Sequence, residues 1–345
     1  MHTLYHRRKK LAHLQMFGHI ESESSPSSAP KPPPSIDPSR FWAVVIGIDD
    51  YSYSPLRGCV SDAKEIADYL LEDLGIAKDH VQLLLSTSPK LTLAHAVSTL
   101  VGAVGGNACI APTRDNIVST LLSLSTDPRI EVGDNIIIYF SGHGVNYRCA
   151  EYYGNSHAGV GTIEALCPVD RDCNSAAGGN VPDISDREIN TILSEISRTK
   201  GHHITFILDC CHASTLTRAV QDEGTVRAIA PLPSGFIAYM LQAADENLRN
   251  LPGYRSVLAE DWFPNMDSHV ILAACKEYEY AREVKCEEGY HGIFTQALTK
   301  ALKSTTHETT YFGLLEALPS TVTQTPVIAG RHRNAKLWYQ FPGIE

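Results

Sequence analysis

The chain has 345 residues, 43% of them hydrophobic, and a formal net charge of -10 at pH 7. This length and apolar content suffice for one large α/β domain with an extension. The acidic balance argues against a nucleic-acid partner, since the one dense basic run, residues 6–10, lies near the N-terminus. No stretch reaches the roughly 18 uninterrupted apolar residues of a membrane span, so we expect no membrane partner either.

The cysteines favour a reducing compartment. The chain holds nine of them, scattered and odd in number, without the Cys-x-x-Cys pairs of structural zinc sites. We also recognise no secretory leader pattern ahead of them. We therefore expect a cytoplasmic protein and predict no metal site.

Two regions differ in composition. Residues 1–39 become rich in Ser and Pro and lose any hydrophobic period, which predicts a disordered tail because such a segment buries too little to offset its ordering entropy. From residue 40 to 345, apolar runs alternate with segments of helical period. This second region is expected to form the folded domain.

The pattern predicts an α/β fold. The expected strands are residues 41–49, 80–85, 134–142, 204–210, 268–275 and 335–341. The expected helices are residues 60–75, 113–124, 185–196, 292–302 and 310–318. Continuous apolar strands that alternate with helices indicate a mainly parallel sheet of about six strands covered on both faces, a three-layer α/β/α sandwich.

Reactive side chains follow two of the predicted strands. Ser141–Gly144 reads SGHG and Asp209–His212 reads DCCH. Ligands of parallel sheets bind beyond the carboxyl ends of the strands, so His143 and a cysteine meet if these strands are neighbours. An imidazole can activate a thiol and protonate a leaving amine. Alternatively, Cys210 and Cys211 are small buried apolar residues.

At these residues the chain resembles a known family. "YFSGHG" and "DCCHAS" are similar to the histidine and cysteine motifs of metacaspases, within the caspase-like cysteine peptidases (clan CD, peptidase family C14), and most resemble fungal caspase-domain proteins. "VVIGIDDYSYSPLRGCVSDA", "ALCPVD" and "HVILAACKEYEYA" agree as well. The resemblance implies a caspase-like fold with a large-subunit part at about 40–212, a linker at 213–267 and a small-subunit part at 268–345.

The resemblance also assigns roles to residues. The nucleophile precedes the histidine in the family motif, which points to Cys211 with His143 as its partner and leaves Cys210 for packing. The backbone N–H groups of Gly144 and Cys211 would form the oxyanion hole. A pocket for Arg or Lys would consist of Asp62, Ser141 and Asp209, since carboxylates accept the donors of a guanidinium. Alternatively, Asp62 serves as a helix-start residue and Asp209 as a strand-end carboxylate.

The function that follows is a cysteine endopeptidase. It would cleave protein or peptide substrates after Arg or Lys through His143 and Cys211, and the family association is with programmed cell death. The connection after Cys211 carries four arginines at which the enzyme could cut itself: Arg218, Arg227, Arg249 and Arg255. The alternative is a catalytically idle caspase-like module used in signalling or assembly.

Two stretches depart from the family pattern. Calcium-activated metacaspases carry an acidic run after the histidine, whereas residues 145–170 hold only Glu151, Glu164 and Asp170 as acids. Calcium needs about six to eight oxygen ligands, and although Asp172, Asp183 and Asp186 could contribute, Arg187 stands where a second acid often lies. The sequence thus leaves calcium open and names no certain cofactor. Residues 90–111 lengthen the connection between the second strand and the next helix, either as a genuine insertion loop or as a translated intron, and we assign them no function.

Overall fold

The computed structural model describes residues 36–86 and 109–339, apart from 155, 157–158, 160, 172, 174–179, 212–223, 234, 288 and 321–323. The chain divides into two compact units, Met1–Pro33 and Pro34–Glu345, and the description below concerns the second. Most of the predicted tail and of the predicted insertion therefore lies outside the described residues. Within them, no helix has both the length and the apolarity needed to cross a membrane.

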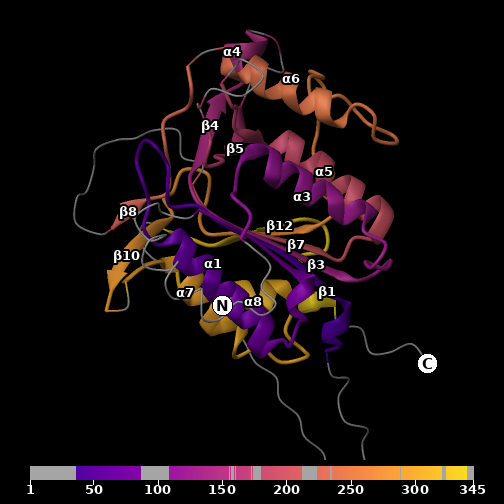
Figure 1. The fold of residues 1–345 in the computed structure, drawn as a ribbon, viewed down its shortest axis with the longest axis vertical. Coiled ribbons are helices and arrows are strands. Elements are labelled where there is room, and N and C mark those ends of the chain that lie inside the picture. Colours follow the sequence, from indigo (N-terminus) through magenta and orange to yellow (C-terminus); the bar gives the residue numbers. More distant parts are fainter. Residues whose placement is uncertain are drawn as a thin grey trace, which may run out of the picture. The chain divides into compact units, whose positions relative to one another are not determined.

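A six-stranded sheet forms the centre of the fold (Figure 1). Its order is β12-β9-β7-β3-β1-β2, and every neighbouring pair is parallel except β12 with β9. The strands are β1 Phe41–Gly47, β2 Val81–Leu85, β3 Asn135–Ser141, β7 Ile204–Asp209, β9 Val270–Ala273 and β12 Val327–Ala329. The predicted caspase-like α/β fold with a mainly parallel sheet is confirmed.

The predicted strand at 335–341 is wrong. Residues Leu337–Tyr339 form a 3₁₀ turn in which Trp338 adopts a left-handed φ of 56°. The Trp338 ring packs edge-on against Phe41 and Tyr311, so this apolar run is buried by ring packing instead of strand pairing. The sixth strand is β12, which directly follows Pro326.

Helices cover both faces of the sheet because the buried strands alternate their side chains. On one face Trp42, Val44 and Ile46 pack in a core with α3 Arg114–Thr126, α5 Asp186–Lys200 and α6 Phe236–Leu248. On the other, Val45 packs in a second core with α1 Cys59–Asp68, α7 Ile293–Leu302 and α8 Tyr311–Ala317. Figure 1 shows these two groups of helices on opposite sides of the sheet.

Hydrogen bonds fix where the helices begin. The Thr113 hydroxyl accepts from Asn116 N at the start of α3, as the sequence predicts, and the Ser185 hydroxyl accepts from Glu188 N at the start of α5. Helix α1 takes its cap from outside, because the Asp49 carboxylate accepts from Cys59 N at 2.8 Å and from Val60 N at 3.3 Å. Residues Tyr69–Asp73 then extend α1 as a π-helical turn.

Two small antiparallel sheets were not predicted. One contains β4 Gly144–Arg148, β5 Thr162–Leu166 and β6 Ile184–Ser185, with the short helix α4 Ala150–Tyr153 after β4. The other contains β8 Thr225–Val226, β10 Arg282–Cys286 and β11 Gly289–Gly292. These strands are too short and too polar to show a clear period in the sequence. They supply much of the site described next.

Candidate active site

The two motif-bearing strands are neighbours. β3 and β7 run parallel with Ser141 opposite Asp209, so the His143 turn and the two cysteines leave adjacent strand ends. Cys210 belongs to the core shared with α3 and α5, whereas Cys211 belongs to the core shared with α1 and α7. Because successive side chains of an extended chain alternate, the two thiols face opposite sides of the sheet.

A tyrosine holds the turn that presents His143. The Tyr51 hydroxyl accepts from His143 N at 2.9 Å and donates to Cys167 O at 3.0 Å, and its ring lies 4.6 Å from the imidazole. A Cβ atom at position 142 would lie 2.6 Å from the Tyr51 hydroxyl oxygen. Gly142 is therefore required by the close approach of this tyrosine.

The imidazole of His143 has a defined tautomer. Its Nε2 atom lies 2.7 Å from Ser54 O, and a carbonyl oxygen only accepts, so Nε2 carries the proton. Nδ1 is buried without a hydrogen-bond partner among the described residues, which leaves its lone pair free to accept a proton. Burial lowers the pKa of His143 to about 4, against the opposing effect of the Ser54 and Arg227 backbones. Ser54 itself has a left-handed φ of 58°.

Cys211 is fully buried beside the backbone of Ala281. Its Sγ donates to Ala281 O at 3.2 Å and accepts from Ala281 N at 2.8 Å. Burial raises the pKa of the Cys211 thiol well above its usual value, and the neighbouring Cys275 raises it further. In this arrangement Cys211 is a protonated thiol.

The side chain of Arg227 fills the pocket that the sequence assigned to a basic residue. Its guanidinium lies 2.5 Å from Asp62 Oδ2, 2.8 Å from Asp209 Oδ2 and 2.9 Å from Ser141 Oγ. All four side chains are fully buried. Asp62, Ser141 and Asp209 thus converge on one guanidinium, and that guanidinium comes from the chain itself.

The backbone of Arg227 lies among the expected oxyanion-hole donors. Arg227 O accepts from Cys211 N and from Gly144 N, each at 3.2 Å, and Arg227 N donates to Ala281 O at 3.0 Å. Before it, β8 pairs antiparallel with β10; after it, Ile229 N donates to Gly144 O at 3.4 Å. Residues 225–229 therefore cross the site with backbone hydrogen bonds on both sides of Arg227, and the Arg227 carbonyl lies beside Cys211.

Two further residues complete the pocket. Glu283 Oε2 lies 3.8 Å from Arg227 Nη2 and accepts from Gly58 N at 2.9 Å. Gly292 N donates to Asp62, and a Cβ at Gly292 would lie 2.6 Å from Arg227 Nη1 and 2.7 Å from Asp62 Oδ2. Burial raises the pKa of Asp62 to about 6, and the Arg227 guanidinium opposes that rise. The pocket thus has room for a guanidinium only because position 292 has no side chain.

The other candidate cleavage arginines lie elsewhere. Arg249 follows α6 and forms an exposed ion pair with Glu246 at 3.6 Å, while Arg255 is paired with Asp261 at 2.8 Å. Arg218 lies outside the described residues. The predicted linker is not a bare loop, because it contains β8 and α6.

Among the described residues, no group of three candidate ligand atoms includes Asp170, Asp183 or Asp186, the acids considered for calcium. Asp183 accepts from Arg171 Nε at 2.8 Å and from the Tyr147 hydroxyl at 2.6 Å, and Asp170 accepts from Arg114 N. Asp172 lies outside the described residues. The Arg171 guanidinium already neutralises Asp183, which opposes calcium binding there.

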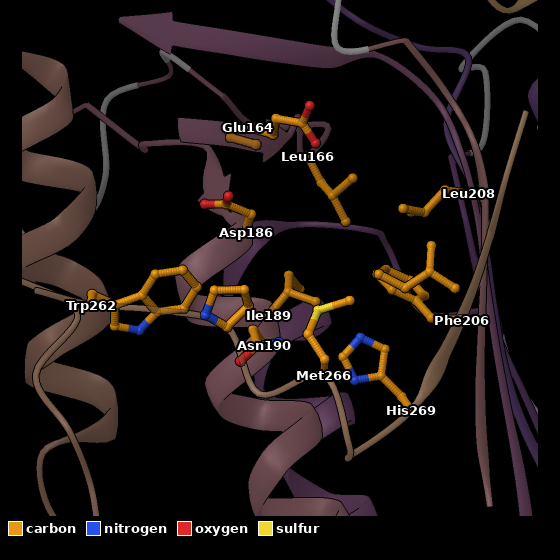
Figure 2. A pocket seen from close by; sticks show the side chains of 13 residues that line it. Glu164, Leu166, Asp186, Ile189, Asn190, Phe206, Leu208, Trp262, Met266 and His269 are labelled. Carbon is orange, nitrogen blue, oxygen red and sulfur yellow. The ribbon is translucent and has the colours of Figure 1, made fainter. Parts of the chain in front are cut away.

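Asp186 instead faces Glu164 at one end of a cavity of about 310 Å³, with His269 toward the opposite end (Figure 2). Burial raises the pKa of each carboxyl to about 7; Glu164 adds to the effect on Asp186, and Glu277 to that on Glu164. Arg187 stacks over Trp262 beside this cavity, at 5.2 Å from its ring centre. Two carboxyls in a mostly apolar cavity do not fit calcium, and we derive no step through it.

Several residues of the site escaped the sequence reasoning. Tyr51, Ser54 and Ala281 act through the hydroxyl or the backbone, which carry no sequence signal of their own. Glu283 lies in a strand too short to predict. Gly292 offered a signal, since it directly precedes the helical pattern of α7 at the point where a backbone comes close.

The fold and these residues define a caspase-like α/β protein with a histidine and a cysteine at adjacent strand ends. A comparison with known families matches residues 40–337 to the caspase domain of peptidase family C14. The chain belongs to this family.

The relatives found are metacaspases. Metacaspase-1 of Arabidopsis thaliana is 29% identical over 231 residues, which cover 61% of this chain and 53% of the relative. Metacaspase-8 of the same plant is 25% identical over 182 residues, covering 52% and 39%. Metacaspase-1 of Botryotinia fuckeliana is 28% identical over 174 residues, covering 50% and 34%. The matches thus span about half or less of each relative.

A solved structure shares the fold. Protein GSU0716 of Geobacter sulfurreducens superposes with a TM-score of 0.52 at 16% identity, over 84% of this chain and 92% of that one. At this identity the likeness concerns the fold alone.

Proposed function

We propose that the protein is a cysteine endopeptidase that cleaves after arginine and that Arg227 is its own first substrate residue. One observation carries this proposal: the Arg227 guanidinium lies on Asp62 and Asp209 while its carbonyl accepts from Cys211 N and Gly144 N. A substrate arginine in a productive complex would need the same two sets of contacts. The bond to be cut is then Arg227–Ala228.

The chemistry follows from the two motif residues. For the reaction, Cys211 Sγ leaves its hydrogen bond to Ala281 O, passes its proton to His143 Nδ1 and attacks the Arg227 carbonyl carbon. The oxyanion forms between Cys211 N and Gly144 N, and the 3.2 Å bonds seen to the planar carbonyl shorten as charge develops. His143 then gives its proton to the Ala228 nitrogen, the C–N bond breaks, and water hydrolyses the thioester.

The pocket favours arginine over lysine. Asp62 and Asp209 bind different nitrogens of the guanidinium, and Ser141 binds one of them too. A lysine ammonium is a single point of charge on a flexible stem and cannot reach both carboxylates with the same geometry. We therefore infer that lysine is a poorer substrate than arginine.

The idle-module alternative has one observation in its favour. The Cys211 thiol is fully buried and is bonded to Ala281, so it is not poised as a thiolate. Burial of the thiol is, however, expected in both cases, because an active site occupied by the Arg227 segment would be covered as well. The two readings differ in what happens on prolonged incubation.

The test is self-cleavage of the purified chain. We expect intact-mass analysis to show a cut between Arg227 and Ala228 in the wild type, slower cutting in Arg227→Lys and none in Arg227→Gln. Cys211→Ala, prepared in parallel, should stay whole, which excludes a contaminating protease. Arg249→Gln is the matched control and should be cut like the wild type. A stable wild-type chain that also fails to cleave an added arginine peptide would establish the idle module.

A further inference from the structure

A second cluster of potential ligands lies against the outer side of Asp62. His291 Nδ1 is 3.5 Å from Asp62 Oδ1 and 3.7 Å from Glu65 Oε2, and the three atoms all lie within 4.8 Å of one another. His291 comes from β11, whereas the two acids lie one turn apart on α1. Only one other group of three such ligand atoms occurs in the described part of the chain.

That other group, Asp49, Cys59 and Glu283, is explained by the fold. The Asp49 carboxylate caps α1 through Cys59 N and Val60 N, and Glu283 accepts from Gly58 N, directly before α1. Burial also raises the pKa of the Cys59 thiol well above its usual value, which opposes the thiolate that a metal needs. This group therefore carries no proposal.

The His291 cluster differs because each of its ligand atoms can still bind an ion: the nitrogen has no hydrogen-bond partner among the described residues, and a carboxylate oxygen can hold a metal as well as a hydrogen bond. His291 Nδ1 is buried and has no hydrogen-bond partner among the described residues. Glu65 is oriented by Thr299 through its other oxygen, Oε1. Among the described residues, Asp62 Oδ1 accepts one hydrogen bond, from Gly292 N at 3.0 Å, and a ligating carboxylate keeps such bonds when it holds a metal.

The spacing suits a tetrahedral ion. Nitrogen and oxygen ligands at about 2.1 Å from Zn²⁺ in tetrahedral geometry lie about 3.4 Å apart, close to the 3.5 and 3.7 Å found here. The side chain of His291 is 15% exposed and that of Glu65 is 34% exposed, so an ion could enter and keep a water as fourth ligand. One imidazole with two carboxylates is a ligand set that zinc accepts.

The charges favour a second cation. Four carboxylates lie together here, those of Asp62, Glu65, Asp209 and Glu283. Within the described part of the chain, Arg227 is the one arginine or lysine whose side chain pairs with any of them, and it contacts all but Glu65. The group is therefore left with an excess of negative charge. A divalent ion near Asp62 would offset that excess.

We propose that Asp62, Glu65 and His291 bind a divalent ion of the Zn²⁺ type and that this ion opposes basic side chains in the adjacent pocket. The second half rests on the proposed function, since Asp62 is shared by the ion and by the arginine. Two cations on one carboxylate repel each other, so each weakens the binding of the other by the same factor. Metal binding would then restrain the peptidase through substrate affinity, not through the thiol.

The binding test uses the full chain with Cys211→Ala, and with the exposed Cys109 and Cys173 replaced by serine so that free thiols do not compete. Zn²⁺ is titrated against a chromophoric chelator. We expect one site whose affinity falls on the order of tenfold to a hundredfold in His291→Ala and in Glu65→Gln. His307→Ala is the matched control, because His307 has one carboxylate neighbour, Glu308 at 3.3 Å, in place of two. Unchanged affinity in both folded cluster variants would overturn the proposal.

Coupling is tested with Arg227→Gln in the same background. Removal of the neighbouring guanidinium should tighten Zn²⁺ binding on the order of tenfold, and equal affinities would refute the antagonism. In the active enzyme, Zn²⁺ should raise KM for an arginine peptide more than it lowers kcat, whereas an ion on Cys211 would lower kcat. Absence of Zn²⁺ binding in a chain that cleaves refutes the metal proposal alone, and Zn²⁺ binding in a chain without any cleavage refutes the proposed function alone.

Discussion

Gly292→Ala tests whether the Arg227 guanidinium fits its pocket only because position 292 has no side chain. The added Cβ would lie 2.6 Å from Arg227 Nη1 and 2.7 Å from Asp62 Oδ2, and nearer still to Asp209 Oδ2, so the guanidinium cannot stay. Gly292 has φ -72°, which alanine adopts without strain, so the effect is steric. Two charge-assisted hydrogen bonds, each about 1.5 kcal/mol at the low end of their range, are lost. Self-cleavage should slow about a hundredfold.

A second readout separates this effect from unfolding. Once Arg227 leaves its pocket, the segment that covers Cys211 is released, and Cys211 should react faster with iodoacetamide although cleavage is slower. Cys210, buried on the opposite face, should stay protected in the same peptide map. Gly313→Ala, on α8, is the matched control. Wild-type cleavage in Gly292→Ala, or equal labelling of both thiols, would refute the steric argument.

Three further outcomes are expected. Cys211→Ala should abolish cleavage while Cys210→Ser keeps most of it, and equal loss in both, measured with an arginine peptide, would remove the nucleophile assignment. Asp62→Asn should raise KM for arginine peptides with a smaller change for lysine peptides; a uniform change for both would make the carboxylate structural. His143 is held neutral by burial, so its folded pKa of about 4 lies below the unfolded 6.5, and the stability it contributes is present above pH 6.5 and lost toward pH 4. In urea unfolding, the free energy of unfolding of the wild type should therefore fall by roughly 3 kcal/mol more than that of His143→Gln between pH 7 and pH 4. Equal decreases would contradict the low pKa of His143.

The sequence predicted the parts of the fold that depend on burial. Strands β1, β3 and β7 are continuous apolar runs of strand length, which is typical of strands covered on both faces. The aromatic run at 337–339 carries the same signal but is buried by ring packing, which a period cannot distinguish from strand pairing.

The site was predictable where side chains act and hidden where the backbone acts. His143, Cys211 and Asp209 stand out as reactive types at strand ends, and Asp62 as an acid in the first turn of a helix. The docking of Arg227 depends on Ala281 O and on the pairing of β8 with β10, and these are contacts between segments more than fifty residues apart. The sequence does not distinguish the four arginines of the linker, since burial of Arg227 depends on these distant contacts.

The pairing of β8 with β10 has a consequence for turnover. Cutting after Arg227 would leave residues 225–227 hydrogen-bonded to β10, with a new carboxylate beside the oxyanion donors and the guanidinium still between Asp62 and Asp209. This tethered product would compete with every incoming substrate at a high local concentration. Departure of the strand, and not bond breaking, would then set the rate at which the cut enzyme accepts other proteins.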